Sequence, residues 1–203
     1  MNRLALGTVQ LGLPYGIANQ VGQVSRSEAG LMLAYAESCG ISLIDTAIAY
    51  GESETCLGAI GVKGFKVVTK LPSAPNDIDI ADVRNWVRNQ VTASLRRLDV
   101  TKLYGLLLHK PGQLLGRFGA PLAGALLELK AQGLIVKLGV SIYAPEELEA
   151  IDHVFQIELV QAPFNLLDRR LLTSGWLGHL KERDIEVHTR SAFLQGLLLM
   201  PMA

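Results

Sequence analysis

The sequence predicts an α/β fold of the (β/α)8 or TIM-barrel type, with only about seven strands present in this chain. Short apolar segments alternate with longer segments of helical periodicity along the whole sequence. Continuously apolar strands separated by helices are typical of parallel sheets that are covered on the outside. An open doubly wound sheet normally carries G-x-G-x-x-G after its first strand, and the glycines of "GTVQLGLPYG" lack that spacing. A single barrel domain over residues 1–203, with its C-terminal unit missing, fits better.

The first half of the chain contains three predicted β-α units. The strands are expected at 4–8 ("LALGT"), 41–46 ("ISLIDT") and 65–71 ("FKVVTKL"). The helices are expected at 25–40, 52–60 and 82–100. The first helix has the clearest limits, because Ser25 and Glu28 form a capping pattern and Gly40 is a common helix end.

The second half repeats the pattern. Strands are expected at 103–109, 136–141, 157–162 and 185–190. Helices are expected at 121–132, from Pro145 onward, and as one continuous segment at 170–183. Proline is favoured in the first turn of a helix, which supports the short helix that opens at Pro145.

Composition limits the classes of function. The chain has 19 basic and 19 acidic residues and no run of either sign, which argues against nucleic-acid or anionic-membrane binding and favours a small-molecule partner. Cys39 and Cys56 lack metal-ligand spacing, so both are expected to be reduced and buried in a cytoplasmic protein. No apolar run is long enough to span a membrane. Composition does not determine the oligomeric state.

Polar residues stand at the ends of the predicted strands, where the chemistry of such barrels is found. In chain order these are Gly7 and Thr8, Asp45, Lys70, His109, Ser141, Gln161 and Arg190. Taken singly, Asp45 is equally explained as a helix N-cap and His109 as a hydrogen-bonded core histidine. Together with Tyr50, however, the residues of three consecutive strands converge on one part of the mouth. This convergence predicts a site.

The residue types in this group suit proton donation to a carbonyl oxygen. A tyrosine hydroxyl has an ordinary pKa of about 10, and an adjacent ammonium such as that of Lys70 is expected to lower it. Asp45 is expected to keep Lys70 charged, and His109 to orient the carbonyl oxygen. The group contains no activated nucleophile and no metal-ligand cluster. A separate hydride donor, and therefore a cofactor, is implied.

These segments resemble the aldo-keto reductase family over most of the chain. The similarity is carried by "LGTVQLG", "GISLIDTAIAYGESETCLG", "VVTKL", "LLLHKP", "LKAQGLIVKLGVS", "VQAPFNLLDRR" and "SAFLQGLLL". The resemblance implies NADPH-dependent reduction of an aldehyde, ketone or sugar carbonyl, with NADH as the other possible cofactor and no metal. It implies a catalytic tetrad in which Tyr50 donates the proton, formed by Asp45, Tyr50, Lys70 and His109. Cofactor binding is expected from Gly7, Thr8, Ser141, Gln161 and Arg190, with Ser141 and Gln161 on the nicotinamide carboxamide.

Three departures from the family pattern stand out. Ile142 replaces an asparagine that many members place after the serine of the fifth strand. Arg190 occupies a position where many members carry an aromatic ring, so its guanidinium is expected either to stack on the nicotinamide or to meet a phosphate or an acid. The sequence also stops at "LLLMPMA", before an eighth strand, so the first and seventh strands should have unpaired edges and the chain is expected to be a fragment or to lack unobserved residues.

Two other functions remain open from the sequence. The same fold can bind a nicotinamide cofactor as a regulatory subunit that turns over little. Alternatively, Tyr50 and Lys70 can serve elimination or epimerisation instead of hydride transfer. Cofactor binding without turnover favours the first of these functions, and failure to bind any nicotinamide cofactor favours the second.

Overall fold

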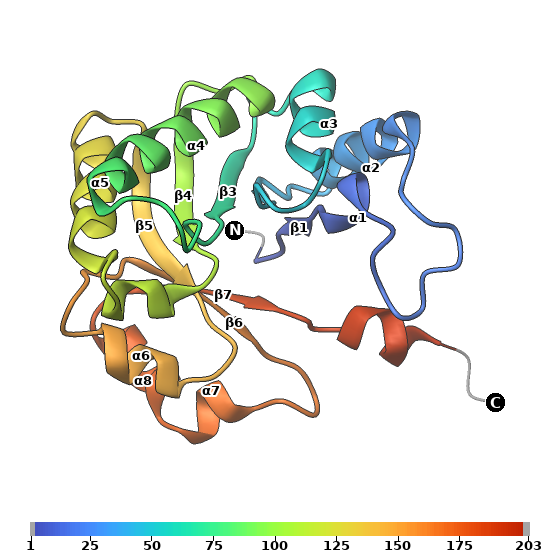
Figure 1. Cartoon of the computed structure of the whole chain (residues 1–203). Coiled ribbons are helices and arrows are strands. Elements are labelled where there is room, and N and C mark those ends of the chain that lie inside the picture. The colour runs from blue at the N-terminus through green and yellow to red at the C-terminus, as the bar shows by residue number, and fades with distance from the viewer. Residues whose placement is uncertain (1–2, 201–203) are drawn as a thin grey trace.

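The computed structural model describes residues 3–200, which form one seven-stranded parallel sheet in the order β1-β2-β3-β4-β5-β6-β7. The strands are β1 (Leu6–Gly7), β2 (Leu43–Asp45), β3 (Lys66–Leu71), β4 (Leu103–Leu108), β5 (Ile135–Ser141), β6 (Leu159–Pro163) and β7 (Glu186–Arg190). The sheet curls into an incomplete barrel with helices on its outer face (Figure 1). The predicted α/β barrel class and its seven strands are confirmed.

Every strand pairs with its neighbour in the sequence, and within residues 3–200 β1 and β7 do not pair with each other. The predicted unpaired edges on the first and seventh strands are therefore present. The segments beyond these edges still meet, because the backbone N–H of Ala18 donates to the carbonyl oxygen of Gln195 at 3.4 Å. In Figure 1 the red segment after β7 accordingly lies beside the blue loop that follows α1.

Helices follow the strands as the sequence predicts. They are α1 (Val9–Gly12), α2 (Arg26–Ser38), α3 (Ser53–Ile60), α4 (Val83–Leu98), α5 (Gly119–Ala131), α6 (Glu146–Ile151), α7 (Arg170–Thr173) and α8 (Trp176–Glu182), with short 3-10 turns at Ile80–Asp82, Pro111–Leu115 and Leu194–Leu199. The capping pattern at the start of α2 is confirmed, since Ser25 accepts from the Glu28 N–H and Glu28 accepts from the Ser25 N–H. These reciprocal bonds satisfy N–H groups that have no partner within the helix.

Some element limits differ from the predictions. The first strand is only two residues long, and the one-turn helix α1 directly after it was not predicted. The prediction of one continuous helix at 170–183 is wrong, because the helical conformation is interrupted between α7 and α8. Gly175 stands at this break with φ of 83°, a left-handed conformation that glycine adopts without steric cost and that interrupts a right-handed helix.

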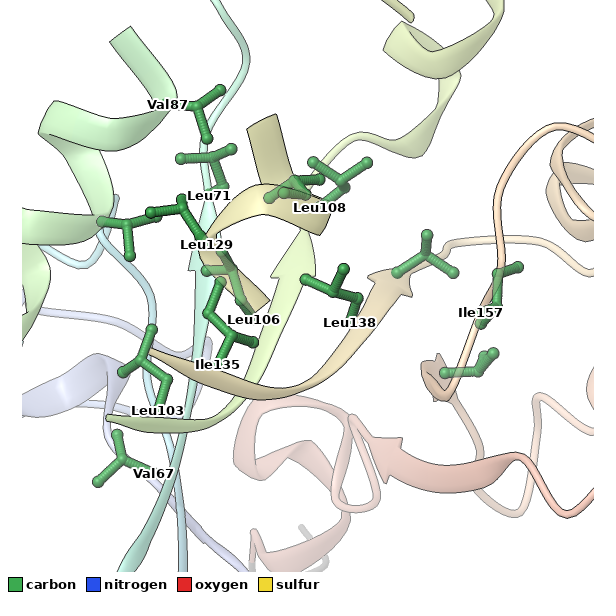
Figure 2. Close-up of a cluster of buried hydrophobic side chains, with 14 of the residues drawn as sticks. Val67, Leu71, Val87, Leu103, Leu106, Leu108, Leu129, Ile135, Leu138 and Ile157 are labelled. Atoms are coloured by element: carbon green, nitrogen blue, oxygen red, sulfur yellow. The ribbon is translucent and has the colours of Figure 1, made fainter. Parts of the chain in front are cut away.

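The main hydrophobic core lies between the sheet and the outer helices. Figure 2 shows its central part, where side chains of β3, β4 and β5 pack together with side chains of α4 and α5, among them Val87 and Leu129. A second, small cluster of Val68, Leu107 and Leu159 lies on the opposite face of the strands. This division follows from strand geometry, since successive side chains of a strand point to opposite faces.

Both cysteines are thiols, as expected, but they differ in burial. Cys56 is a buried residue of α3, whereas Cys39 is exposed at the end of α2, so the prediction that both are buried is wrong for Cys39. Cys39 is the C-cap residue of α2, and the ends of helices are defined only to within one or two residues. Within residues 3–200 no helix has the length and apolar character needed to cross a membrane.

Candidate active site

The predicted site residues lie at the C-terminal rim of the concave face of the sheet. Gln161 on β6 donates through Nε2 to Oδ1 of Asp45 on β2 at 2.7 Å. These strands are not neighbours in the sheet, so this bond crosses the concave side of the curled sheet. Strand ends that are far apart along the sheet are thereby brought to one place.

Lys70 and Asp45 form the ionic centre of this rim. The Lys70 ammonium donates to both Asp45 carboxylate oxygens, at 2.8 and 2.9 Å, and to the carbonyl oxygen of Thr46 at 2.8 Å. The Lys70 side chain is only 1% exposed. Burial lowers the pKa of Lys70, and the carboxylate of Asp45 opposes that effect. Asp45 thus acts in the expected direction on Lys70, and its role in keeping Lys70 charged stays a prediction.

The turn that carries Tyr50 is fixed from two sides. The backbone N–H of Thr46 donates to Val68 O and that of Ile48 to Lys70 O, so the chain after β2 continues alongside β3. On the other side the backbone of α1 lies against the turn. A Cβ atom on Gly12 would lie 1.7 Å from the carbonyl oxygen of Tyr50, so only glycine permits this approach.

Tyr50 meets both Lys70 and His109. The Lys70 Nζ lies 5.0 Å from the centroid of the Tyr50 ring. The Tyr50 and His109 rings are arranged edge to face, with centroids 6.0 Å apart. The structure therefore brings together the four residues expected to form the tetrad.

The expectation that Lys70 lowers the pKa of the Tyr50 hydroxyl is not met. The pKa of Tyr50 is raised, first by burial and then by the negative charge of Asp45, while Arg190 acts in the opposite direction. The geometry gives the reason. Lys70 lies over the face of the ring, and its three donors are directed at Asp45 and Thr46. The phenol is accordingly fully protonated at neutral pH.

His109 follows β4, and its backbone N–H donates to Leu71 O at 3.0 Å. Burial lowers the pKa of its imidazole to about 4, with further lowering from the positive charges of Lys70 and Arg190. A neutral imidazole at pH 7 carries one N–H donor and one acceptor nitrogen. This ring can thus orient an oxygen atom without adding a charge.

Ser141 and Gln161 are paired positions at the ends of β5 and β6, and each is about 2% exposed. The Ser141 hydroxyl donates to Gln161 Oε1 over a long distance, 3.4 Å. Because the other side of the Gln161 amide donates to Asp45, its orientation is fixed. A hydroxyl donor beside an amide is a donor set that fits a carboxamide.

The other two expected cofactor residues belong to β1 and its end. Thr8 is buried, with its hydroxyl bonded to Asp45 O at 3.0 Å and close to the Ser53 hydroxyl at 3.0 Å. Its described contacts therefore hold the first and second strand ends together. Gly7 is exposed on the edge strand. A role in cofactor binding stays a prediction for both residues.

Arg190, at the end of β7, reaches the loop after β5. Its Nη2 donates to Ile142 O at 3.0 Å, and its Cζ lies 4.4 Å from the centroid of the Tyr143 ring. Within residues 3–200 Arg190 has no carboxylate partner, so the expected pairing with an acid is wrong there. Ile142 is buried, and its backbone takes part in the rim: its carbonyl oxygen accepts from Arg190 and its N–H donates to Gln161 O at 2.9 Å.

Sequence reasoning missed a second polar group deeper on the concave face. Glu186 accepts hydrogen bonds from Tyr104 and Lys137, both at 2.6 Å, and its other oxygen lies 2.7 Å from His188 Nε2. Although burial opposes the shift, hydrogen bonds from Lys137 and Tyr104 lower the pKa of Glu186 to about 2. The alternation of Glu186, His188 and Arg190 along β7 was the available signal.

Comparison with known proteins agrees with this geometry. The profile of the Aldo/keto reductase family matches residues 3–201. The chain belongs to the aldo/keto reductase family. Members of this family are nicotinamide-dependent oxidoreductases, so the fold class and the family resemblance seen in the sequence are both confirmed.

Three related aldo/keto reductases show how far the likeness extends. The NADH-specific methylglyoxal reductase of Escherichia coli (strain K12) is 26% identical over 98% of this chain and 65% of its own length. Aldo-keto reductase YhdN of Bacillus subtilis is 28% identical over 97% of this chain and 60% of its own. The glycerol dehydrogenase AKR11B4 of Gluconobacter oxydans superposes with a TM-score of 0.75 at 26% identity, covering 100% of this chain and 63% of the other. This chain thus spans about 60–65% of the length of these relatives.

Proposed function

We propose that this chain reduces the carbonyl group of a small aldehyde, ketone or sugar with a nicotinamide cofactor, and that Tyr50 donates the proton. The observation that carries the proposal is the meeting of Tyr50, Lys70, Asp45 and His109 at one rim, from three consecutive strands and the turn after one of them. Family membership supports the reaction class.

The donor set at the ends of β5 and β6 fits the carboxamide of a nicotinamide. Ser141 supplies a hydroxyl and Gln161 an amide whose orientation is fixed by Asp45. A reduced nicotinamide would supply the hydride. Arg190 lies next to this donor set through its bond to Ile142 O and completes the group of residues expected to contact the cofactor.

The four rim residues have different roles at the substrate oxygen. Tyr50 is protonated at neutral pH and is placed to deliver its proton as negative charge develops on the oxygen. The neutral imidazole of His109 donates a hydrogen bond that orients the oxygen. Arg190 is the positive charge that favours the phenolate left on Tyr50, while Lys70, held in place by Asp45, lies over the Tyr50 ring.

The choice between NADPH and NADH is part of the proposal. The sequence resemblance favours NADPH, whereas the E. coli relative is NADH-specific. The two dissociation constants are measured by titrating the protein with each reduced cofactor and monitoring the quenching of Trp fluorescence. We expect the smaller one for NADPH, and a smaller value for NADH would reverse the assignment.

Replacement of Tyr50 tests the role of the proton donor. We expect Tyr50→Phe to lower kcat about 10²–10⁴-fold, the range for loss of a general acid, with cofactor binding retained. The assay follows the loss of reduced cofactor with methylglyoxal and glyceraldehyde as substrates. Tyr35→Phe is the matched control, because Tyr35 is 73% exposed on α2. Equal kcat values for wild type and Tyr50→Phe would reject the role.

The same assay separates the regulatory alternative from the enzyme. Fluorescence quenching by either reduced cofactor, without oxidation of that cofactor across a panel of carbonyl compounds, would assign the chain to cofactor binding alone. Absence of any quenching would instead favour elimination or epimerisation at Tyr50 and Lys70.

A further inference from the structure

The guanidinium of Arg190 is a positive charge at the rim with only neutral acceptors. Nη2 donates to Ile142 O at 3.0 Å, and Nη1 donates to Ser191 Oγ at 3.3 Å. In the described part of the chain no Asp or Glu oxygen forms an ion pair with it. A guanidinium carries five N–H donors, so several remain for a further partner.

The nearby carboxylates already have partners. Asp45 is bonded to Lys70, and Asp168 accepts from Arg170 at 2.8 and 3.0 Å. Glu147 accepts the backbone N–H groups of Tyr143 and Ala144. The charge of Arg190 still acts on its surroundings, since it contributes to the lowered pKa of Asp168 after the larger contribution of Arg170. None of these three acids therefore pairs with Arg190.

Arg190 is also held in a fixed orientation. Its guanidinium lies over the Tyr143 ring, with Cζ 4.4 Å from the centroid. The Tyr143 backbone is fixed in turn, because its N–H donates to Glu147 and its carbonyl oxygen accepts from Arg170 Nη2 at 3.0 Å. A pre-oriented planar fork loses little conformational entropy when it binds a second planar or tetrahedral acceptor.

We propose that Arg190 binds an anionic group, a carboxylate or a phosphate, of a molecule held at the rim beside Ser141. Arginine binds both groups with paired N–H donors, and such charge-assisted bonds are stronger than neutral ones. The anion belongs either to the carbonyl substrate or to the cofactor. The inference rests on the proposed function only in that a small molecule enters this rim.

Charge at the rim supports this assignment. The charge of Lys70 is balanced by Asp45, whereas Arg190 has no ion-pair partner among residues 3–200. Burial, followed by the charges of Lys70 and Arg190, lowers the pKa of His109. An anion beside Arg190 offsets that positive charge, so ligand binding is expected to raise the pKa of His109.

Binding of anionic probes tests the inference without turnover. Wild type, Arg190→Gln and Arg88→Gln are titrated by calorimetry with inorganic phosphate, succinate and NADH. Arg88 is 53% exposed on α4, so its replacement removes one charge away from the rim. We expect Arg190→Gln to weaken at least one probe about tenfold or more, and Arg88→Gln to weaken none. Equal affinities for all probes in wild type and Arg190→Gln would overturn the inference.

The pattern of losses identifies the source of the anion. Weaker binding of phosphate and NADH, with succinate unchanged, assigns Arg190 to the cofactor. Weaker binding of succinate alone assigns it to the substrate, and then Arg190→Gln also raises KM for succinic semialdehyde about tenfold while KM for butanal stays the same. If Arg190→Gln does not fold, Arg190→Lys replaces it in the titrations. This variant keeps the charge but lacks the paired N–H donors, so it must bind at least one probe more weakly than wild type. A chain that binds these probes through Arg190 but reduces no carbonyl compound contradicts the proposed function and leaves this inference intact.

Discussion

Burial shifts the pKa values of Tyr50, Lys70 and His109, and His109 offers the most direct test. Its pKa is lowered from 6.5 to about 4, so between these values the folded chain binds fewer protons than the unfolded chain. Stability must then rise with pH across that window and fall as the pH is lowered from about 6.5 to about 4. The ring is partly exposed, which screens the effect to about 1–2 kcal/mol.

Unfolding by urea at several pH values measures this dependence. Between pH 6.5 and pH 4 the free energy of unfolding of His109→Gln should fall by about 1–2 kcal/mol less than that of wild type. His153→Gln is a suitable control, since His153 is exposed after α6. A slope that is unchanged in His109→Gln would contradict the burial of a neutral imidazole at this position.

The ion pair of Lys70 and Asp45 gives a second prediction at the residue scale. Lys70 is 1% exposed, so removal of its partner leaves a buried ammonium without a counter-charge. We expect Asp45→Asn to lower the free energy of unfolding by about 3 kcal/mol or more. The double variant Asp45→Asn/Lys70→Met should regain part of that loss, because the buried charge is gone. Denaturant unfolding of both variants measures this, and a double variant less stable than the single one would argue against it.

At the scale of elements, the contact of α1 with the Tyr50 turn fixes the position of the proposed proton donor. A side chain on Gly12 meets the Tyr50 carbonyl oxygen at 1.7 Å and the Ser53 backbone nitrogen at 2.5 Å. The contacting atoms are backbone, so they cannot move aside without displacing the turn. Gly12 is therefore expected to matter for turnover although it carries no functional group.

Gly12→Ala tests this contact against a neutral glycine replacement. We expect Gly12→Ala to destabilise the fold by about 1–3 kcal/mol and to lower kcat more than it raises KM. In Gly30→Ala the new methyl group meets no atom within 4 Å in the interior of α2, so we expect a gain of about 0.5–1 kcal/mol. Thermal unfolding and steady-state kinetics of both variants measure the difference. Similar behaviour of the two variants would show that the α1 contact is unimportant.

For the whole molecule, the sheet leaves β1 and β7 with edges that no described strand covers. Apolar side chains are also exposed near the segments beyond these edges, among them Ile17, Phe193 and Leu199. Open edges and apolar patches favour association between chains. We therefore expect this 203-residue chain to associate as its concentration rises.

Light scattering over a range of concentrations measures the association. Thr189 is exposed on β7, and a lysine there places a charge on the edge strand. We expect Thr189→Lys to shift association to higher concentration, because charged edge residues oppose strand pairing. Lys181→Gln, on α8, removes a charge elsewhere and serves as the comparison. Concentration-independent scattering of the unmodified chain would count against the expectation.

The sequence alone predicted the order of strands and helices, because apolar periodicity and capping signals are local. It also placed Asp45, Lys70, His109, Ser141, Gln161 and Arg190 at strand ends, since parallel strands present their carboxyl ends at one rim. The family motifs around these residues were likewise readable. These properties depend on neighbouring residues in the chain and need no knowledge of distant contacts.

Only the tertiary structure decided the acidity and orientation of the site. The raised pKa of Tyr50 comes from burial and from Asp45, and the predicted help from Lys70 failed because that ammonium points to Asp45 and Thr46. The stacking of Arg190 on Tyr143 joins strand ends that are distant in the sequence. Such effects depend on distances across the concave face, which local patterns do not encode. The sequence thus determined which groups reach the rim, and the fold determined the charges they carry there.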